Sequence, residues 1–128
     1  MEREILFRGR IVDDSRWIEG SFTIDCKGEC EILHQLKTPH GGFQFLKVIP
    51  ETVGQFTGMT DKNGTKIFEG DIVKEQYKSH EIIYNVYWDE DYFAFRVKSK
   101  DYSYYLDELV PSNSEVIGNI HDNKELLK

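Results

Sequence analysis

The chain has 128 residues, of which 13% are aromatic, and this length suits one domain. Its net charge is −7, and neither half has a surplus of basic residues, so nucleic acid is a disfavoured partner. No apolar run approaches the ~20 residues of a membrane-spanning helix, and the first residues do not resemble a secretion signal. Because two cysteines in such a chain fit a reducing compartment, we expect a cytoplasmic protein without a membrane partner.

The first fifty residues contain four segments with the alternating or aromatic-rich patterns typical of β-strands. Clusters of Asp, Ser, Gly or Pro separate these segments and predict turns. The predicted strands span residues 4–12, 17–24, 31–36 and 43–49. We therefore expect a strand-rich N-terminal lobe over residues 1–50, built as a β-meander of hairpins.

The strongest turn signal in the chain is Asp61-Lys62-Asn63-Gly64, because Asn-Gly tolerates the positive φ angles of tight hairpin turns. It predicts a hairpin that joins residues 56–60 to residues 66–68. The preceding stretch, residues 51–58, reads either as a short strand or as an ordered connector. After residue 71 the pattern predicts a strand over 72–75 and then a polar loop as far as His80.

The clearest antiparallel pair is predicted for residues 82–88 and 93–97, where apolar and polar side chains alternate so that one face packs on a core. Residues 103–110 fit either a strand or a helical turn. A last strand is expected over 115–120. Asp122 and Glu125 fit the start of a short C-terminal helical turn with a capping acid.

Two cysteines and two histidines form the most suggestive set of metal ligands: Cys26, Cys30, His34 and His40. Their C-x3-C-x3-H-x5-H spacing matches no common structural zinc pattern. We interpret them instead as small apolar cysteines and ordinary histidines. The sequence therefore predicts no metal and no cofactor.

Other chemical signals also fit turns better than sites. Asp61 and Asn63 echo the start of a calcium loop but lack its later ligands. The three acids of residues 89–91 sit at a predicted hairpin tip, whereas an acid/base pair must converge on one cleft. The sequence contains no nucleophile elbow, phosphate-binding loop or His-Glu-x-x-His motif, so we assign no catalytic residue and expect no enzyme.

The stretch from residue 52 to residue 73 resembles the YopX family of small phage and prophage proteins, and the resemblance continues through 86–89 to 115–123. Lys124 departs from the family, which often has proline there, and Cys26 and Cys30 lie outside its pattern. The residues that carry the motif, which we expect to shape turns, are Thr52, Val53, Gly54, Gln55, Phe56, Thr57, Gly58, Asp61, Asn63, Gly64, Phe68, Glu69, Gly70, Asp71, Ile72, Val73, Gly118 and Asn119.

The resemblance implies a mainly β fold whose later half is a small SH3-like barrel, with no established activity and no catalytic residue to carry over. Together with the strand pattern, it predicts one domain over residues 1–128. In this domain the barrel lobe, residues 51–128, does not fold independently of the N-terminal lobe.

The function expected from these observations is that of a prophage-encoded accessory protein that binds itself and a phage or host protein. The later half carries too many tyrosines for one small core, and exposed tyrosines are typical of contact surfaces. These tyrosines are Tyr84, Tyr87, Tyr92, Tyr102, Tyr104 and Tyr105. The alternatives are a nucleic-acid-associated regulatory protein, suggested by fold analogy alone, and a small hydrolase without a recognisable motif.

Overall fold

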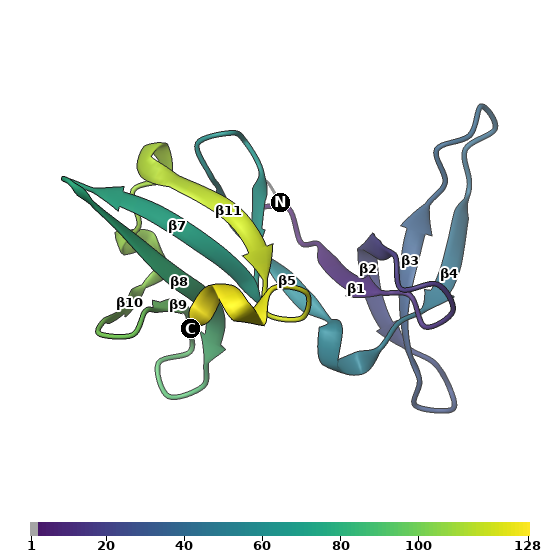
Figure 1. Ribbon diagram of the computed structural model, residues 1–128. Helices are drawn as coiled ribbons and strands as arrows, with labels where there is room; N and C mark the ends of the chain where they lie inside the picture. Colours follow the sequence, from purple (N-terminus) through teal and green to yellow (C-terminus); the bar gives the residue numbers. More distant parts are fainter. Residues whose placement is uncertain (1–2) are drawn as a thin grey trace. The chain divides into compact units, whose positions relative to one another are not determined.

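The computed structural model describes residues 3–128 and is mainly β, with eleven strands and four short 3-10 turns in that range. The chain forms two compact units, the first ending at Phe56 and the second beginning at Thr57 (Figure 1). None of the helical turns within residues 3–128 has the length and apolar character needed to cross a membrane.

The first unit is an antiparallel sheet in the order β4-β3-β2-β1-β5. Its first four strands are β1 (Phe7–Arg10), β2 (Trp17–Ile24), β3 (Cys30–Gln35) and β4 (Phe43–Lys47). Their alternation places Ile11, Ile18, Ile32 and Val48 in one buried cluster. These strands fall within or close to the four segments predicted from the sequence.

Strand β5 (Gly54–Thr60) follows a 3-10 turn at Pro50–Thr52 and crosses the boundary between the units. Its first residues pair with β1, where Gln55 lies opposite Phe7. Its later residues lie beside β6 (Lys66–Phe68), and the Thr57 hydroxyl donates a hydrogen bond of 2.7 Å to the Ile67 carbonyl. The predicted hairpin around Asn63-Gly64 is thus confirmed.

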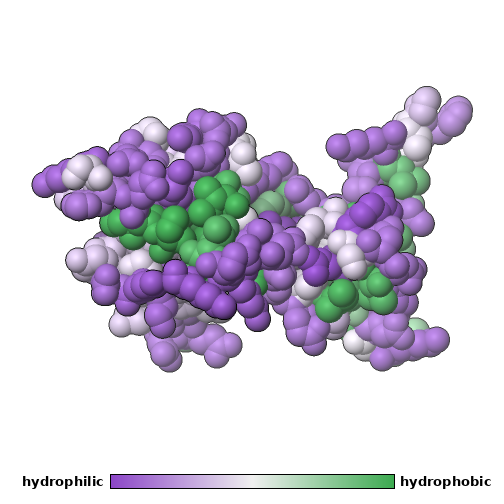
Figure 2. Space-filling model, viewed as in Figure 1, coloured by the Kyte–Doolittle hydropathy of each residue, from purple (hydrophilic) through white to green (hydrophobic). Residues whose placement is uncertain are grey.

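The second unit contains a five-stranded antiparallel sheet in the order β10-β9-β8-β7-β11. Its strands are β7 (Asp71–Tyr77), β8 (His80–Asp89), β9 (Ala94–Lys98), β10 (Ser103–Tyr105) and β11 (Ser114–Asn119). A buried cluster packs against it, made of Ile67, Val73, Tyr84, Val86, Val97, Leu106 and Leu109. In Figure 2 an apolar patch is visible over β7, bordered by polar side chains.

The closed SH3-like barrel expected from the sequence is not confirmed, because among the described residues the five-stranded sheet ends at β10 and β11 without joining them. Strand β10 has only three residues before the chain turns at Leu106. On the opposite edge, β11 is irregular between Val116 and Gly118. A short edge strand and a bulged one limit the ladder that closure requires.

Three segments either differ from the sequence prediction or decide between its alternatives. The polar loop predicted up to His80 is wrong, since β7 runs to Tyr77 and β8 begins at His80. Residues 103–110 combine both alternatives, as β10 is followed by a 3-10 turn at Leu106–Glu108. Another turn lies at Pro111–Asn113, and the chain ends in a 3-10 turn at Lys124–Leu127 whose N-cap is Asn123 rather than Asp122.

Candidate functional site

The β7–β8 hairpin of the second unit forms one wall of an aromatic pocket. Glu75 lies opposite Ile82, and Tyr77 lies opposite His80, next to the two-residue turn that closes the hairpin. Directly paired residues of antiparallel strands project from the same face of the sheet. This register therefore brings an acid, a phenol and an imidazole together above the buried Tyr84.

The opposite wall comes from Tyr102, from Tyr104 on β10, and from the segment 108–110. The rings of Tyr102 and Tyr104 stack with centroids 5.9 Å apart and an interplanar angle of 15°. The ring of Tyr104 also meets that of Tyr84 edge-on, with centroids 6.3 Å apart. The pocket between these walls has a volume of about 710 Å³, and we call it the tyrosine pocket.

Two carboxylates line the tyrosine pocket. Glu75 is buried, and its Oε2 accepts a hydrogen bond of 3.0 Å from the Val110 backbone N–H. Glu108 is exposed, and its Oε2 accepts one of 3.2 Å from the Tyr105 N–H. Burial and then the negative charge of Glu75 raise the pKa of Tyr84 to about 12. Tyr84 is therefore a neutral phenol at physiological pH.

A second aromatic arrangement lies on the other face of β9 and β10, because Tyr105 pairs with Arg96 across these strands. The Arg96 guanidinium carbon lies 4.4 Å from the ring centroid of Tyr92 and 4.6 Å from that of Tyr105. Its Nε is 3.4 Å from Oδ2 of Asp89. Here the protein already holds a cation against two tyrosine rings that meet edge-on.

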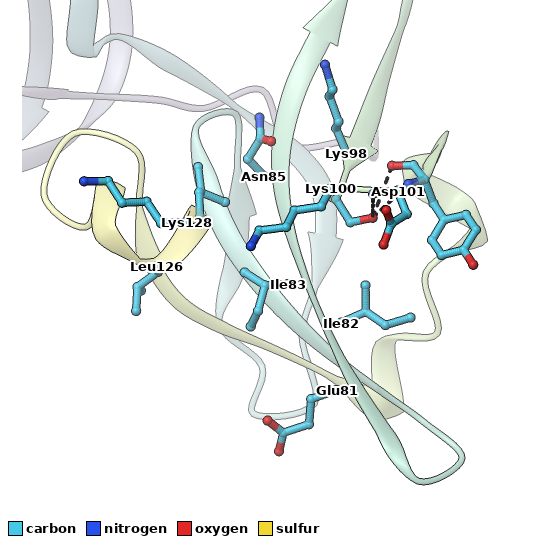
Figure 3. A pocket seen from close by; sticks show the side chains of 12 residues that line it. Glu81, Ile82, Ile83, Asn85, Lys98, Lys100, Asp101, Leu126 and Lys128 are labelled. Carbon is cyan, nitrogen blue, oxygen red and sulfur yellow. Dashed lines mark hydrogen bonds between the residues drawn. The ribbon is translucent and has the colours of Figure 1, made fainter.

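A second pocket, of about 410 Å³, lies between β8, the β9–β10 turn and the C-terminal turn (Figure 3). Its labelled lining combines Ile83 and Leu126 with charges of both signs, including Lys100 and Glu81. The turn is fixed by Ser99, whose Oγ accepts a hydrogen bond of 3.0 Å from the Tyr102 N–H. Mixed charges beside apolar side chains favour a solvated groove over a specific anion or cation site.

The structure does not bring the four candidate zinc ligands together as a metal site. Cys26 is exposed in a turn, while Cys30 is half-buried on β3. His34 Nδ1 lies 3.1 Å from the Glu19 carbonyl oxygen, and His40 lies in an exposed turn. No group of three His, Cys, Asp or Glu residues within 3–128 is arranged to hold a metal ion.

The motif residues lie in strands, in turns and in the residues that adjoin them, and they line neither the tyrosine pocket nor the second pocket. Asp61 Oδ1 accepts hydrogen bonds of 2.9 Å from the N–H groups of Asn63 and Thr65 and closes the β5–β6 turn. Asp71 Oδ2 accepts one of 2.7 Å from the Phe68 N–H. The glycine between them, Gly70, adopts a φ of 93° that favours glycine.

Sequence reasoning identified Tyr102 and Tyr104 as surface residues but missed Glu75, Tyr77 and Glu108. The first two lie in or next to the segment that was predicted as a loop, where no Asn-Gly or Asp-Gly pair marks the hairpin. The alternation of side chains at residues 73, 75 and 77 is the sequence signal that could have extended the predicted strand to Tyr77. No local pattern predicts that Glu108 faces the same pocket.

Comparison with protein families matches residues 7–128 of this chain to the family described as YopX protein. Among solved structures, the chain is similar to one described as the crystal structure of protein EF1440 from Enterococcus faecalis. The two are 22% identical with a TM-score of 0.63, over 98% of this chain and 99% of that chain. This likeness concerns the fold alone. A comparison with curated proteins found no match.

Proposed function

The chain belongs to the YopX family, and we propose that it acts by binding another protein and by associating with itself. In this proposal it is a prophage-encoded accessory protein that works in the cytoplasm of the bacterial host. The supporting observation is the large aromatic surface of the second unit.

Many large aromatic side chains of the second unit lie on its surface and not in its core. Seven aromatic side chains there have exposed fractions between 37% and 81%, namely Tyr77, Trp88, Tyr92, Phe93, Tyr102, Tyr104 and Tyr105. Large exposed aromatic groups are enriched at protein–protein contacts, where they bury much area at low entropic cost. The same unit has nine basic and fourteen acidic residues, a net charge of −5, which favours a partner with a basic surface.

Self-association is supported by an edge strand of the first unit. Strand β4 forms one end of the sheet, and its side chains Phe43 and Phe45 are 66% and 58% exposed. An edge strand with exposed apolar rings is a template for pairing with a second copy. We therefore assign the self-association surface to β4.

Light scattering coupled to size exclusion tests the self-association. The chain should elute as a dimer or larger species, and a Phe43→Ser, Phe45→Ser variant should elute as a monomer of 15.0 kDa. Both side chains are exposed, so the variant should stay folded. Ile24→Ser, at an equally exposed position on β2, is the matched control and should keep the oligomer. A monomer for the unmodified chain at every concentration contradicts this part of the proposal.

Affinity capture from host lysate tests the binding of another protein. The unmodified chain should retain a partner that is lost when two exposed rings, Tyr77 and Tyr102, are both replaced by serine. The β4 variant serves as the control and should retain the same partner. Identical sets of captured proteins for all three baits would show that the aromatic surface does not bind a partner.

A further inference from the structure

The tyrosine pocket combines aromatic rings with two carboxylates, and this combination has a specific chemistry. We propose that it binds one cationic side chain, an arginine or a lysine, from a basic segment of the partner protein. The inference rests on the proposed function, because it names the chemical group by which that partner is recognised.

The rings provide the first part of the argument. A cation within about 6 Å of the face of a tyrosine ring is attracted by the negative charge on that face. The tyrosine pocket is lined by four such rings, those of Tyr77, Tyr84, Tyr102 and Tyr104. Stacking of Tyr102 on Tyr104, and the edge contact of Tyr104 with Tyr84, hold three of them in place before a ligand arrives.

The charges provide the second part. Glu75 is only 8% exposed, and the hydrogen bond from the Val110 N–H fixes its carboxylate against the pocket wall. Hydrogen bonds from the Val110 N–H and from Tyr84 offset part of the cost of removing this carboxylate from water, and a bound cation offsets more of it. Glu108 adds a second negative charge at the exposed side. Phosphates and carboxylates are repelled by the same pair.

The size of the pocket provides the third part. Its volume of about 710 Å³ lies within the range of about 300–1,000 Å³ that is usual for ligand sites. Such a space admits a long side chain together with the neighbouring backbone. The exposed rings of Tyr77 and Tyr102 leave it open to an approaching chain segment.

Within the protein, tyrosine rings already contact one arginine and one lysine side chain. On the other face of β10, the Arg96 guanidinium lies against the rings of both Tyr92 and Tyr105. At the rim of the tyrosine pocket, Lys78 Nζ lies 5.5 Å from the ring centroid of Tyr77. His80 lines the pocket and Lys78 lies in the adjoining β7–β8 turn, so an incoming cation must share this end of the pocket with two basic groups.

The test uses the full chain, labelled with nitrogen-15, and acetylated glycine pentapeptides that carry one central arginine, lysine, norleucine or glutamate. The arginine and lysine peptides should shift the amide signals of residues 75–84 and 102–110. The norleucine and glutamate peptides should leave them unchanged. Affinity for the arginine peptide should fall about 10-fold in Glu108→Gln and in Tyr102→Ser, since each removes one attractive group from the pocket.

Glu108→Gln keeps the oxygen that accepts the Tyr105 N–H bond, and Tyr102 is exposed, so both variants should remain folded. The matched controls are Glu90→Gln, which removes an exposed charge elsewhere, and Ile24→Ser, which removes an exposed apolar side chain elsewhere. Both should bind the arginine peptide as the unmodified chain does.

Three results would overturn the inference: equal shifts with the norleucine peptide, unchanged affinity in both pocket variants, or binding of tetramethylammonium without binding of either basic peptide. The last would assign the pocket to a small quaternary ammonium ligand. A partner captured through the aromatic surface, without any binding of the basic peptides, would leave the proposed function standing and reject only the pocket inference. Peptide binding without a captured partner would support the pocket inference and reject the proposed function.

Discussion

The carboxylate of Asp61 accepts a hydrogen bond of 2.8 Å from the backbone N–H of Val116, which lies 55 residues further along the chain. Its other oxygen closes the hairpin turn through Asn63 and Thr65. One buried side chain therefore fixes a local turn and anchors β11 to it.

Replacing Asp61 by alanine should lower the free energy of unfolding by about 3 kcal/mol, because three N–H groups lose a charged acceptor. Asp61→Asn should lose less, since it retains one carbonyl oxygen. Urea denaturation followed by fluorescence measures both. Lys62→Ala, at the exposed neighbouring position, is the control and should change stability by less than about 0.5 kcal/mol. Equal stability of Asp61→Ala and Lys62→Ala would contradict this role.

Asp61 should also make stability depend on pH. Burial opposes its ionisation, but the N–H groups of Val116, Thr65 and Asn63 outweigh it and hold the pKa of this carboxyl below its usual value. A carboxyl with a lowered folded pKa stabilises the protein above the unfolded pKa of about 3.9, and this contribution is lost as pH falls through the folded value. Acid titration of the urea midpoint should show a weaker loss in Asp61→Asn than in the unmodified chain. Parallel curves would exclude Asp61 as a source of the acid sensitivity.

Gly20 on β2 should not tolerate alanine. An added Cβ would overlap the Leu33 carbonyl group of β3 and approach the Ile32 side chain to 2.9 Å. Backbone atoms of a paired strand cannot move without breaking the ladder, so Gly20→Ala should destabilise the protein by about 2 kcal/mol. Thermal denaturation followed by circular dichroism measures the change. Ser21→Ala, an exposed neighbour, should leave the midpoint unchanged; a similar midpoint for both would contradict the predicted overlap.

Arg96 should contribute to stability through its planar group and not through charge alone. Its guanidinium contacts Tyr92 and Tyr105 and lies 3.4 Å from Asp89, and its side chain is only 11% exposed. Arg96→Lys keeps the charge but cannot stack on two rings in the same way, so it should cost about 1 kcal/mol. The near-ultraviolet circular dichroism of the tyrosines should weaken with it. Lys98→Arg, at an exposed site two residues further on, is the control. Unchanged spectra and stability in Arg96→Lys would show that the positive charge alone accounts for the contribution of Arg96 to stability.

The elements predicted best from the sequence are those set by local patterns. Strand β2 begins and ends at the predicted residues, Trp17 and Ile24, because turn residues precede and follow a segment with strand-like side chains. The hairpin after β5 was predicted correctly because Asn63-Gly64 specifies a tight turn. Phe93 was wrongly placed in a strand: it adopts a φ of 51° in the turn before β9 and is 81% exposed.

The features that depend on distant parts of the chain could not be predicted. Whether a sheet closes into a barrel depends on the register of its edge strands, which alternation does not encode. Alternation correctly put Tyr84 on the inward face, but counting Tyr84 with Tyr104 among the surplus tyrosines was wrong, because Tyr84 is buried and Tyr104 is exposed. The tyrosine pocket brings together residues of β7, β8, β10 and the turn after β10. No local sequence pattern therefore indicates that its two carboxylates, Glu75 and Glu108, face the same pocket.

The boundary between the two units falls inside β5, between Phe56 and Thr57, and not in a linker. The same seven-residue strand pairs with β1 at its start and lies beside β6 further on. Genetic exchange that joined the two halves from different relatives would therefore have to preserve both pairings within one short strand. Because one continuous strand joins the two units, proteolysis of the folded protein should not cut between them.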